Sequence, residues 1–346
     1  MNAAPRPVAI TMGDPAGVGP EIIAKLFRRR PQWASRCVVV GDVEVMRRAA
    51  HVTGGRLPLA VIERWADAAQ VPPGSLPVLP VAGLSAPVAW GRVSPMAGAA
   101  AIAAIECAVQ AALQGDVAAV VTAPVHKEAL HQAGLPYPGH TEFLQALAAR
   151  HQGCPVAQMP VRMMLSNDEL RTVLVSIHVS LRTAIEAVTL ENVLETIRIT
   201  DRHLRQVMGM AAPRIAVAGL NPHAGEGGLF GREEVDVIAP AVAAARAEGV
   251  DAHGPLPPDT VFMQARRGAY DVVVAQYHDQ GLIPVKYLGL EHGVNTTLGL
   301  PFLRTSPDHG TAFDLAGTGR ADPSSLEAAV AAALREPPLP RRPKPD

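Results

Sequence analysis

Residues 7–21 read PVAITMGDPAGVGPE and indicate the fold class of the chain. The apolar run from Pro7 to Met12 has the length of a buried strand, and the glycines that follow allow a tight turn. Pro20 suits the first position of a helix, because its φ already matches the helix and its missing N–H would have no partner there. A strand, a glycine-rich turn and a helix in this order are the opening unit of an α/β protein.

The same alternation continues along the chain. Apolar runs of strand length end at five further positions, with helical patterns between most of them: Thr122, Leu165, His178, Gly219 and Tyr277. This alternation predicts a largely parallel sheet with helices on both faces. The stretch 72–88, which holds several prolines, is expected to be a loop or a domain edge. The proline-rich, charged residues 337–346 are expected to form a disordered tail.

Some helix ends are marked by specific residues. Asp42 can cap the helix that follows the second apolar run. Ser94, followed by a proline, predicts the start of a long alanine-rich helix that runs to Gln114. Gly115 then stands where a left-handed residue ends a helix.

The composition restricts the class of protein. The chain has 346 residues, of which 48% are hydrophobic and 18% charged, so a large core is expected. A net charge of -1 argues against a basic nucleic-acid surface. Three cysteines without a C-x-x-C pair argue against a disulfide framework and a cysteine zinc site. With no uninterrupted apolar stretch of membrane-spanning length, we expect a cytoplasmic protein with neither nucleic acid nor membrane as partner.

Three histidines stand in the same topological position. His178, His223 and His278 each lie at or just after the end of an expected strand. Ligands of open α/β sheets bind beyond the carboxyl ends of the strands, so the three imidazoles can converge there. Three histidines with one open position form a known catalytic zinc site, and imidazole also suits iron and cobalt. Each histidine taken alone could equally be a hydrogen-bonded loop residue.

Three segments are candidate binding loops: residues 13–21, 221–228 and 308–314, the last of which precedes a glycine-rich stretch at 316–319. The first is not a dinucleotide fingerprint, because Ile22 stands where that pattern needs glycine or alanine. It is either a tight turn or a ligand contact. Near these loops, Lys127, Lys286 and Arg304 are suited to a phosphate or carboxylate, or are solvated surface charges.

Longer motifs carry a resemblance to a known family. They are GHTEF at 139–143, GLNPHAGE at 219–226, GPLPPDT at 254–260, YHDQG at 277–281, GVN at 293–295 and LGLPFLRTS at 298–306. In order and spacing they closely resemble the 4-hydroxythreonine-4-phosphate dehydrogenases of pyridoxal phosphate synthesis. The resemblance runs from about Ile10 to about Pro323.

The resemblance implies a fold similar to that of isocitrate and isopropylmalate dehydrogenases, with two α/β/α domains and a cleft between them. Residues 1–125 and 300–336 would form the first domain and residues 126–299 the second. It also implies a homodimer with its site at the subunit interface. His178, His223 and His278 would bind one divalent metal ion (zinc, cobalt or magnesium), with His278 supplied by the partner chain.

Further site residues follow from the same resemblance. The substrate would be bound by five side chains: His140, Thr141, Lys286, Asn295 and Arg304. The loop that would bind the adenosine of NAD or NADP contains His309, Gly310, Thr311, Ala312 and Asp314. Asp279 follows the ligand His278 and is expected to act as the base or to orient that imidazole. It could equally be a turn residue that caps the following segment.

The implied reaction is the NAD-dependent oxidation of 4-phosphohydroxy-L-threonine, followed by decarboxylation to 3-amino-2-oxopropyl phosphate. Members with similar motifs act on D-threonate or D-erythronate 4-phosphate, which is the alternative within the family. Retention of His140, Thr141 and Arg304 argues against a branch that oxidises a terephthalate dihydrodiol. A metal-dependent hydrolase built on the three histidines and a non-catalytic binding protein are the alternatives from other classes.

Overall fold

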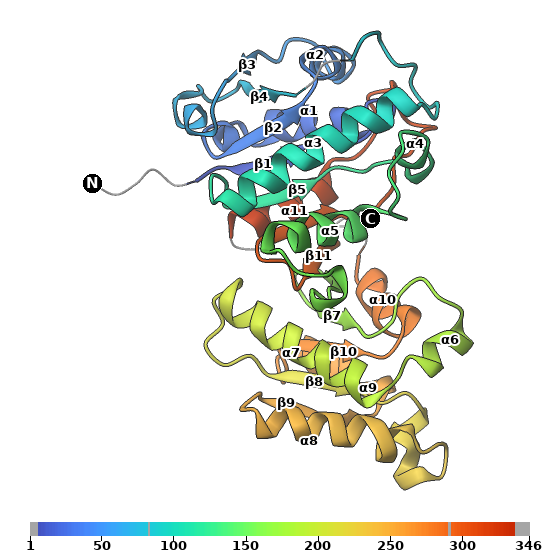
Figure 1. Cartoon of the computed structure of the whole chain (residues 1–346). Helices are drawn as coiled ribbons and strands as arrows, with labels where there is room; N and C mark the ends of the chain where they lie inside the picture. The colour runs from blue at the N-terminus through green and yellow to red at the C-terminus, as the bar shows by residue number, and fades with distance from the viewer. Residues whose placement is uncertain (1–5, 82–83, 290–291, 336–346) are drawn as a thin grey trace, which may run out of the picture. The chain divides into compact units, whose positions relative to one another are not determined.

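The computed structural model describes residues 6–81, 84–289 and 292–335, and these form two compact units (Figure 1). The first unit contains the chain up to Met159 and again from Leu300. The second unit is Pro160–Gly299. The expected tail at 337–346 lies outside the described residues.

The boundary between the units differs from the one expected at residue 125. Helices α4 (Lys127–Gln132) and α5 (His140–Gln152) belong to the first unit, because both pack on α3 (Pro95–Gln114). Gly98 of α3 makes this close packing possible. A Cβ atom at that position would lie 2.0 Å from the carbonyl oxygen of Ala129 on α4.

The sheet of the first unit has the strand order β3-β4-β2-β1-β5-β12, and all neighbouring strands run parallel. The strands are β1 (Val8–Thr11), β2 (Cys37–Gly41), β3 (Leu59–Val61), β4 (Leu76–Pro80), β5 (Ala119–Thr122) and β12 (Leu303–Pro307). Figure 1 shows α3 in front of this sheet, with α1 (Gly19–Arg29) and α11 (Ser324–Leu334) behind it. The predicted parallel α/β arrangement is confirmed for this unit.

Local sequence explains several element boundaries in this unit. The Asp42 side chain accepts a hydrogen bond from the Val45 N–H at 2.9 Å and caps α2 (Val43–Val52). Ser94 caps α3, and Gly115 ends it with a φ of 81°. The stretch 72–88, expected to be a loop, contains β4, whose Leu76 is fully buried. β4 pairs with a strand on each side, and this long-range pairing overrides the local proline signal.

Helix α3 is the one helix of the described residues that is long and apolar enough to cross a membrane. Half of its most apolar window is buried inside the protein. It packs against α4 and against strands β1, β2 and β5. These contacts are those of a core helix in an α/β unit.

The sheet of the second unit has the order β11-β6-β7-β10-β8-β9. Its strands are β6 (Arg162–Ser166), β7 (Arg171–Leu174), β8 (Ile215–Ala218), β9 (Ala252–Leu256), β10 (Val272–Ala275) and β11 (Val294–Leu298). β7, β10, β8 and β9 run parallel, whereas β6 is antiparallel to both β7 and β11. Mixed strand direction is therefore confined to one end of this sheet.

Helices cover both faces of the second sheet. Val272 and Val274 of β10 belong to a core that includes residues of α7 (Leu190–Gln206) and α8 (Ala239–Ala247). Val273 and Ala275 belong to a second core with residues of α9 (Pro258–Arg266) and α10 (His278–Tyr287). Successive residues of a strand point to opposite faces, so a strand covered on both sides is apolar throughout.

Candidate functional site

The three strand-end histidines all lie in the second unit. His178 follows β7, His223 lies in the turn after β8, and His278 is the first residue of α10, directly after β10. β10 pairs in parallel with both β7 and β8, so the carboxyl ends of these strands share one edge of the sheet. The topology expected from the sequence is therefore present.

Two of these imidazoles lie next to each other. The ring centroids of His178 and His278 are 5.6 Å apart, and the rings are tilted by 46°. The Nδ1 atom of His278 lies 2.7 Å from Oδ1 of Asp279. This contact occupies Nδ1, so Nε2 is the nitrogen that His278 can offer to a ligand. Asp279 therefore holds the His278 imidazole in one orientation.

His223 lies in a strained loop. Its φ is 51°, and the following Ala224 and Glu226 also have positive φ values of 53° and 44°. Each such non-glycine residue costs on the order of 1–3 kcal/mol and persists only when neighbouring structure enforces it. The ring centroid of His223 is 6.2 Å from that of Phe230, with the rings tilted by 40°.

Glu234 holds this loop in its conformation. This role of Glu234 was not predicted from the sequence. Its side chain is 2% exposed, and Oε1 accepts hydrogen bonds from the N–H groups of Leu220 and Asn221, both at 2.7 Å. Oε2 accepts a third from the Asn221 side chain at 3.0 Å. A Cβ atom at Gly225 would lie 2.6 Å from this carboxylate, so glycine is needed there.

Two glutamines tie the strand ends together. Nε2 of Gln276 donates to the carbonyl oxygen of Ala218, and Nε2 of Gln280 donates to that of Gly219, both at 2.7 Å. The Gln276 N–H donates to Oε1 of Gln280 at 2.7 Å. The turn that carries His278 is thereby attached to the turn that leads to His223. Sequence reasoning missed both residues, although the second lies in the quoted YHDQG motif.

His223 and Asp279 line one pocket of about 740 Å³, together with Tyr277, Asp259 and neighbouring apolar side chains. This volume is in the range of small-molecule sites. Among the described residues, no group of three histidine, cysteine or acidic side chains is placed to hold a metal ion. One chain therefore brings two of the three candidate ligands together and places the third in the adjoining pocket.

Among the described residues of the first unit, Arg304 is the most deeply buried cation. It is 3% exposed, and it donates hydrogen bonds from Nε and Nη2 to the Thr122 hydroxyl at 3.2 and 2.6 Å. Burial lowers the pKa of Arg304 to about 10, so the guanidinium stays charged at neutral pH. Thr122 is the last residue of β5, and the guanidinium is held at the carboxyl end of that strand.

His140, the first residue of α5, lies close to this cation. Burial, followed by the charges of Arg304 and Lys127, lowers the pKa of His140 to about 3. Its imidazole is therefore neutral at physiological pH. Nε2 is buried and has no hydrogen-bond partner within the described part of the chain. Thr141 follows in the first turn of α5, where helical N–H groups face an anion favourably.

The other two expected substrate-binding residues lie in the second unit. Lys286 is in the last turn of α10. Asn295 is on β11 and pairs with Leu165 of β6. His140, Thr141 and Arg304 are thus grouped in one unit, and Lys286 and Asn295 belong to the other.

The expected cofactor loop packs against the first glycine-rich turn. The Val18 N–H donates to the Thr311 carbonyl oxygen at 3.0 Å, and a Cβ atom at Gly17 would lie 3.0 Å from that of Thr311. His309, Gly310 and Asp314 are exposed, and a Cβ atom at Gly310 would meet nothing within 4 Å. The loop is therefore open at Gly310 and buried at Thr311.

Two polar residues beside this loop, the half-buried His126 and the buried Asp14, had no role assigned from the sequence. The ring of His126 stacks on that of Phe313, with centroids 4.7 Å apart. Asp14, in the first glycine-rich turn, accepts a hydrogen bond from the Ala16 N–H at 2.8 Å, and burial raises its pKa. A histidine and an acid far apart in sequence gave no local signal of this arrangement.

The α/β fold, with a buried arginine, a neutral histidine and imidazoles at strand ends, is typical of an enzyme. The model of one family, described as pyridoxal phosphate biosynthetic protein PdxA, matches residues 33–333. The chain belongs to this family.

Individual relatives are similar over nearly their whole length. A 4-hydroxythreonine-4-phosphate dehydrogenase of Beijerinckia indica is 56% identical, with 95% of this chain and 94% of the relative covered. A D-threonate 4-phosphate dehydrogenase of Salmonella typhimurium is 47% identical, with 95% and 98% covered. The crystal structure of a 4-hydroxythreonine-4-phosphate dehydrogenase from Klebsiella pneumoniae superimposes with a TM-score of 0.85 at 45% identity, covering 95% of this chain and 99% of that one. The protein is accordingly an oxidoreductase.

Proposed function

We propose that this protein oxidises 4-phosphohydroxy-L-threonine to 2-amino-3-oxo-4-phosphooxybutanoate with NAD or NADP, as a cytoplasmic enzyme of pyridoxal phosphate biosynthesis. The product would lose carbon dioxide to give 3-amino-2-oxopropyl phosphate. The observation that carries this proposal is the adjacency of His178 and His278 in a family whose relatives bear that name. A bound metal would supply Lewis acidity to the substrate hydroxyl, and a bound nicotinamide would accept the hydride.

His178, His223 and His278 are the proposed metal ligands. The donor set fits a divalent ion such as zinc or cobalt, because imidazole is a borderline-soft ligand, and abundance could favour magnesium. Two of the imidazoles are adjacent in one chain, whereas His223 is not among them. We propose that a second copy of the chain completes the ligand set, with His278 crossing between the subunits.

Asp279 would set the direction of the His278 ring. The 2.7 Å contact between the carboxylate and Nδ1 favours the tautomer in which Nε2 carries the free lone pair. The Asp279 side chain is 71% exposed. This geometry supports the orienting role more directly than the role of base.

Five side chains would bind the polar groups of the substrate. Arg304 keeps its charge when buried and, with the neutral His140 and Thr141, suits a phosphate or carboxylate. Lys286 and Asn295 would bind a second polar group of the substrate.

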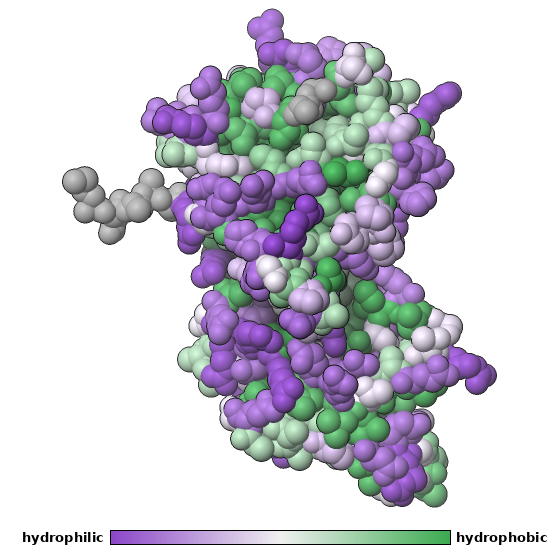
Figure 2. Space-filling view, in the orientation of Figure 1, coloured by the Kyte–Doolittle hydropathy of each residue, from purple (hydrophilic) through white to green (hydrophobic). Residues whose placement is uncertain are grey.

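Exposed apolar side chains support the proposed homodimer. Among the described residues, eleven of the fourteen exposed large hydrophobic side chains belong to the second unit. They include Leu181 and Ile185 on α6 (Leu181–Glu186), Ile283 and Tyr287 on α10, and Leu229. Figure 2 shows hydrophobic side chains at the surface in the region that α10 occupies in Figure 1. Such a concentration is typical of a protein interface.

The substrate panel tests the proposal. NADH formation is measured with 4-phosphohydroxy-L-threonine, D-threonate 4-phosphate and D-erythronate 4-phosphate, each before and after chelation and metal return. The proposal expects the highest kcat/KM for the first substrate and loss of activity on chelation. A preference for D-threonate 4-phosphate, the second candidate supported by the Salmonella relative, would replace the substrate assignment. Phosphate release without NAD would instead indicate a hydrolase.

A further inference from the structure

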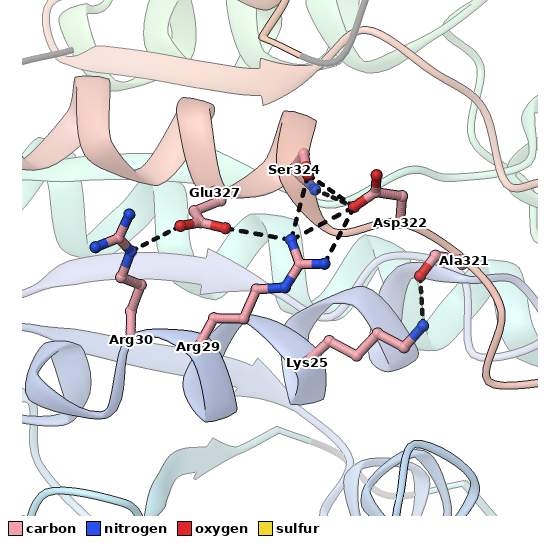
Figure 3. Close-up of polar contacts among 7 residues, drawn as sticks. All are labelled: Lys25, Arg29, Arg30, Ala321, Asp322, Ser324 and Glu327. Atoms are coloured by element: carbon pink, nitrogen blue, oxygen red, sulfur yellow. Dashed lines mark hydrogen bonds and ion pairs between the residues drawn. The ribbon is translucent and has the colours of Figure 1, made fainter. Parts of the chain in front are cut away.

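One face of α1 forms hydrogen bonds and ion pairs with the segment that follows the proposed cofactor loop. Glu21, Lys25 and Arg29 are spaced four residues apart and therefore lie on the same side of the helix. Lys25 donates from Nζ to the Ala321 carbonyl oxygen at 2.6 Å. Nη1 of Arg29 donates to Ser324 at 3.2 Å and forms an ion pair with Asp322. Figure 3 shows Lys25 and Arg29 pointing from α1 toward residues 321–327.

Glu21 makes the contact that lies nearest to the cofactor loop. It is 1% exposed, and its two carboxylate oxygens accept hydrogen bonds from separate backbone N–H groups. Oε1 accepts from Gly317, and Oε2 accepts from Gly319 at 2.9 Å. Hydrogen bonds to a buried charge are about twice as strong as neutral ones, so the Glu21 carboxylate holds the backbone of both glycines firmly in place.

The two glycines that it holds are confined on other sides as well. A Cβ atom at Gly317 would lie 2.3 Å from the ring of Trp90, and one at Gly319 would lie 2.3 Å from the Val52 carbonyl oxygen. Both glycines have positive φ values, 81° and 67°. The Arg48 guanidinium lies 4.5 Å from the Trp90 ring centroid on this side of the loop.

The beginning of the same segment is attached to the same part of the chain. Thr311 bonds to Val18, at the start of α1, and Phe313 stacks on His126. Residues 311–319 are therefore held at one end by the turn before α1 and at the other by Glu21 in its first turn. A loop held in this way is ordered before a ligand arrives, so binding loses less conformational entropy.

We propose that Glu21 is a positioning residue for the nicotinamide dinucleotide, acting through the loop that it holds. This inference rests on the proposed cofactor role of His309 to Asp314. Glutamine at position 21 can accept from one glycine N–H but presents an NH₂ group to the other. Part of the segment would then be free to move, and the cofactor would have to order it on binding.

The test compares Glu21→Gln with Arg29→Gln in the full chain. Arg29 belongs to the same face of α1 but contacts residues 322–327, beyond the cofactor loop. The dissociation constant for NAD is measured by titration calorimetry, and amide exchange in residues 311–319 by mass spectrometry. Glu21→Gln should weaken NAD binding about tenfold and speed this exchange, because it removes a charge-assisted hydrogen bond. Arg29→Gln should lower Tm and change neither quantity.

Outcomes separate this inference from the proposed function. Unchanged NAD affinity in Glu21→Gln, or a loss no larger than in Arg29→Gln, would overturn the inference alone. A wild-type protein that binds no NAD would overturn the cofactor assignment and the inference together. If Glu21→Gln does not fold, Glu21→Asp replaces it, since the shorter side chain keeps the charge but cannot reach both glycines. A partial loss of NAD affinity in Glu21→Asp supports the inference. Unchanged NAD affinity in Glu21→Asp overturns it.

Discussion

The imidazole rings of His178 and His278 lie 5.6 Å apart, although about a hundred residues separate them in the chain. Their adjacency follows from the parallel pairing of β7 with β10, which places the ends of both strands on one edge of the sheet. Asp279 holds the second ring by its Nδ1 atom. Strand pairing thus brings two of the three proposed metal ligands to one edge of the sheet within a single chain.

Replacing Asp279 with asparagine should weaken metal binding. The amide would not favour the same tautomer of His278, and loss of such an orienting partner typically reduces metal affinity or activity about 10- to 100-fold. Zinc content and kcat would be measured together. Asp251→Asn is a matched control, because Asp251 contacts the ring of His253 at the same 2.7 Å on the surface. Equal metal affinity in both variants would contradict the orienting role.

Glu234→Gln should destabilise the loop that carries His223. The loop has several positive φ values and is held by a buried carboxylate that accepts from two backbone N–H groups. Removing the charge should cost about 2 kcal/mol of unfolding free energy and lower metal content. The adjacent Glu233→Gln is the control, since Glu233 bonds to the Asn221 side chain. Urea denaturation that ranks the two variants equally would exclude a special role for Glu234.

Arg304→Lys should raise KM for the phosphorylated substrate with a smaller effect on thermal stability. Lysine keeps the charge but loses the planar group that bonds to Thr122 through two nitrogens. We expect kcat/KM to fall roughly 10- to 100-fold, as for loss of one charge-assisted hydrogen bond. Lys25→Arg, a charge-conserving change at a cation that bonds to Ala321, is the control. Unchanged kinetics in Arg304→Lys would remove Arg304 from the substrate site.

Stability should fall in mild acid because of His203, which is 3% exposed on α7. Burial lowers its pKa from 6.5 to about 4. The unfolded chain therefore binds a proton that the folded chain rejects, and the stability present above pH 6.5 is lost as the pH falls toward 4. Between pH 7.5 and 5 this amounts to about 2 kcal/mol.

The measurement is urea unfolding of the wild type and His203→Leu at both pH values. His203→Leu should lose less stability in acid than the wild type, because leucine cannot take up a proton in the unfolded state. His151→Leu, at an exposed position, should keep the wild-type pH dependence. The same pH dependence in all three proteins would show that His203 is not the group responsible.

Local sequence was sufficient for features that depend on neighbouring residues. Asp42 and Ser94 mark helix starts through hydrogen bonds that span three residues. Pro20 stands in the first turn of α1, as its place after the glycine turn predicted. Apolar runs predicted the parallel sheet of the first unit. Strand ends likewise indicated where His178 and His278 would lie.

Tertiary packing decided what no local pattern encodes. The first unit extends to Met159 because Gly98 lets α4 approach α3, and β4 forms among prolines because strands flank it on both sides. Glu234 holds its loop through a hydrogen bond to a residue 13 positions away in the chain. Glu21 holds its loop through a hydrogen bond to a residue 298 positions away. Helix caps and hydrophobic periodicity act over a few residues, whereas a buried carboxylate needs donors that only the folded chain brings to it. The sequence by itself therefore determined the α/β class and the position of two imidazoles, and the fold decided how the loops around them are held.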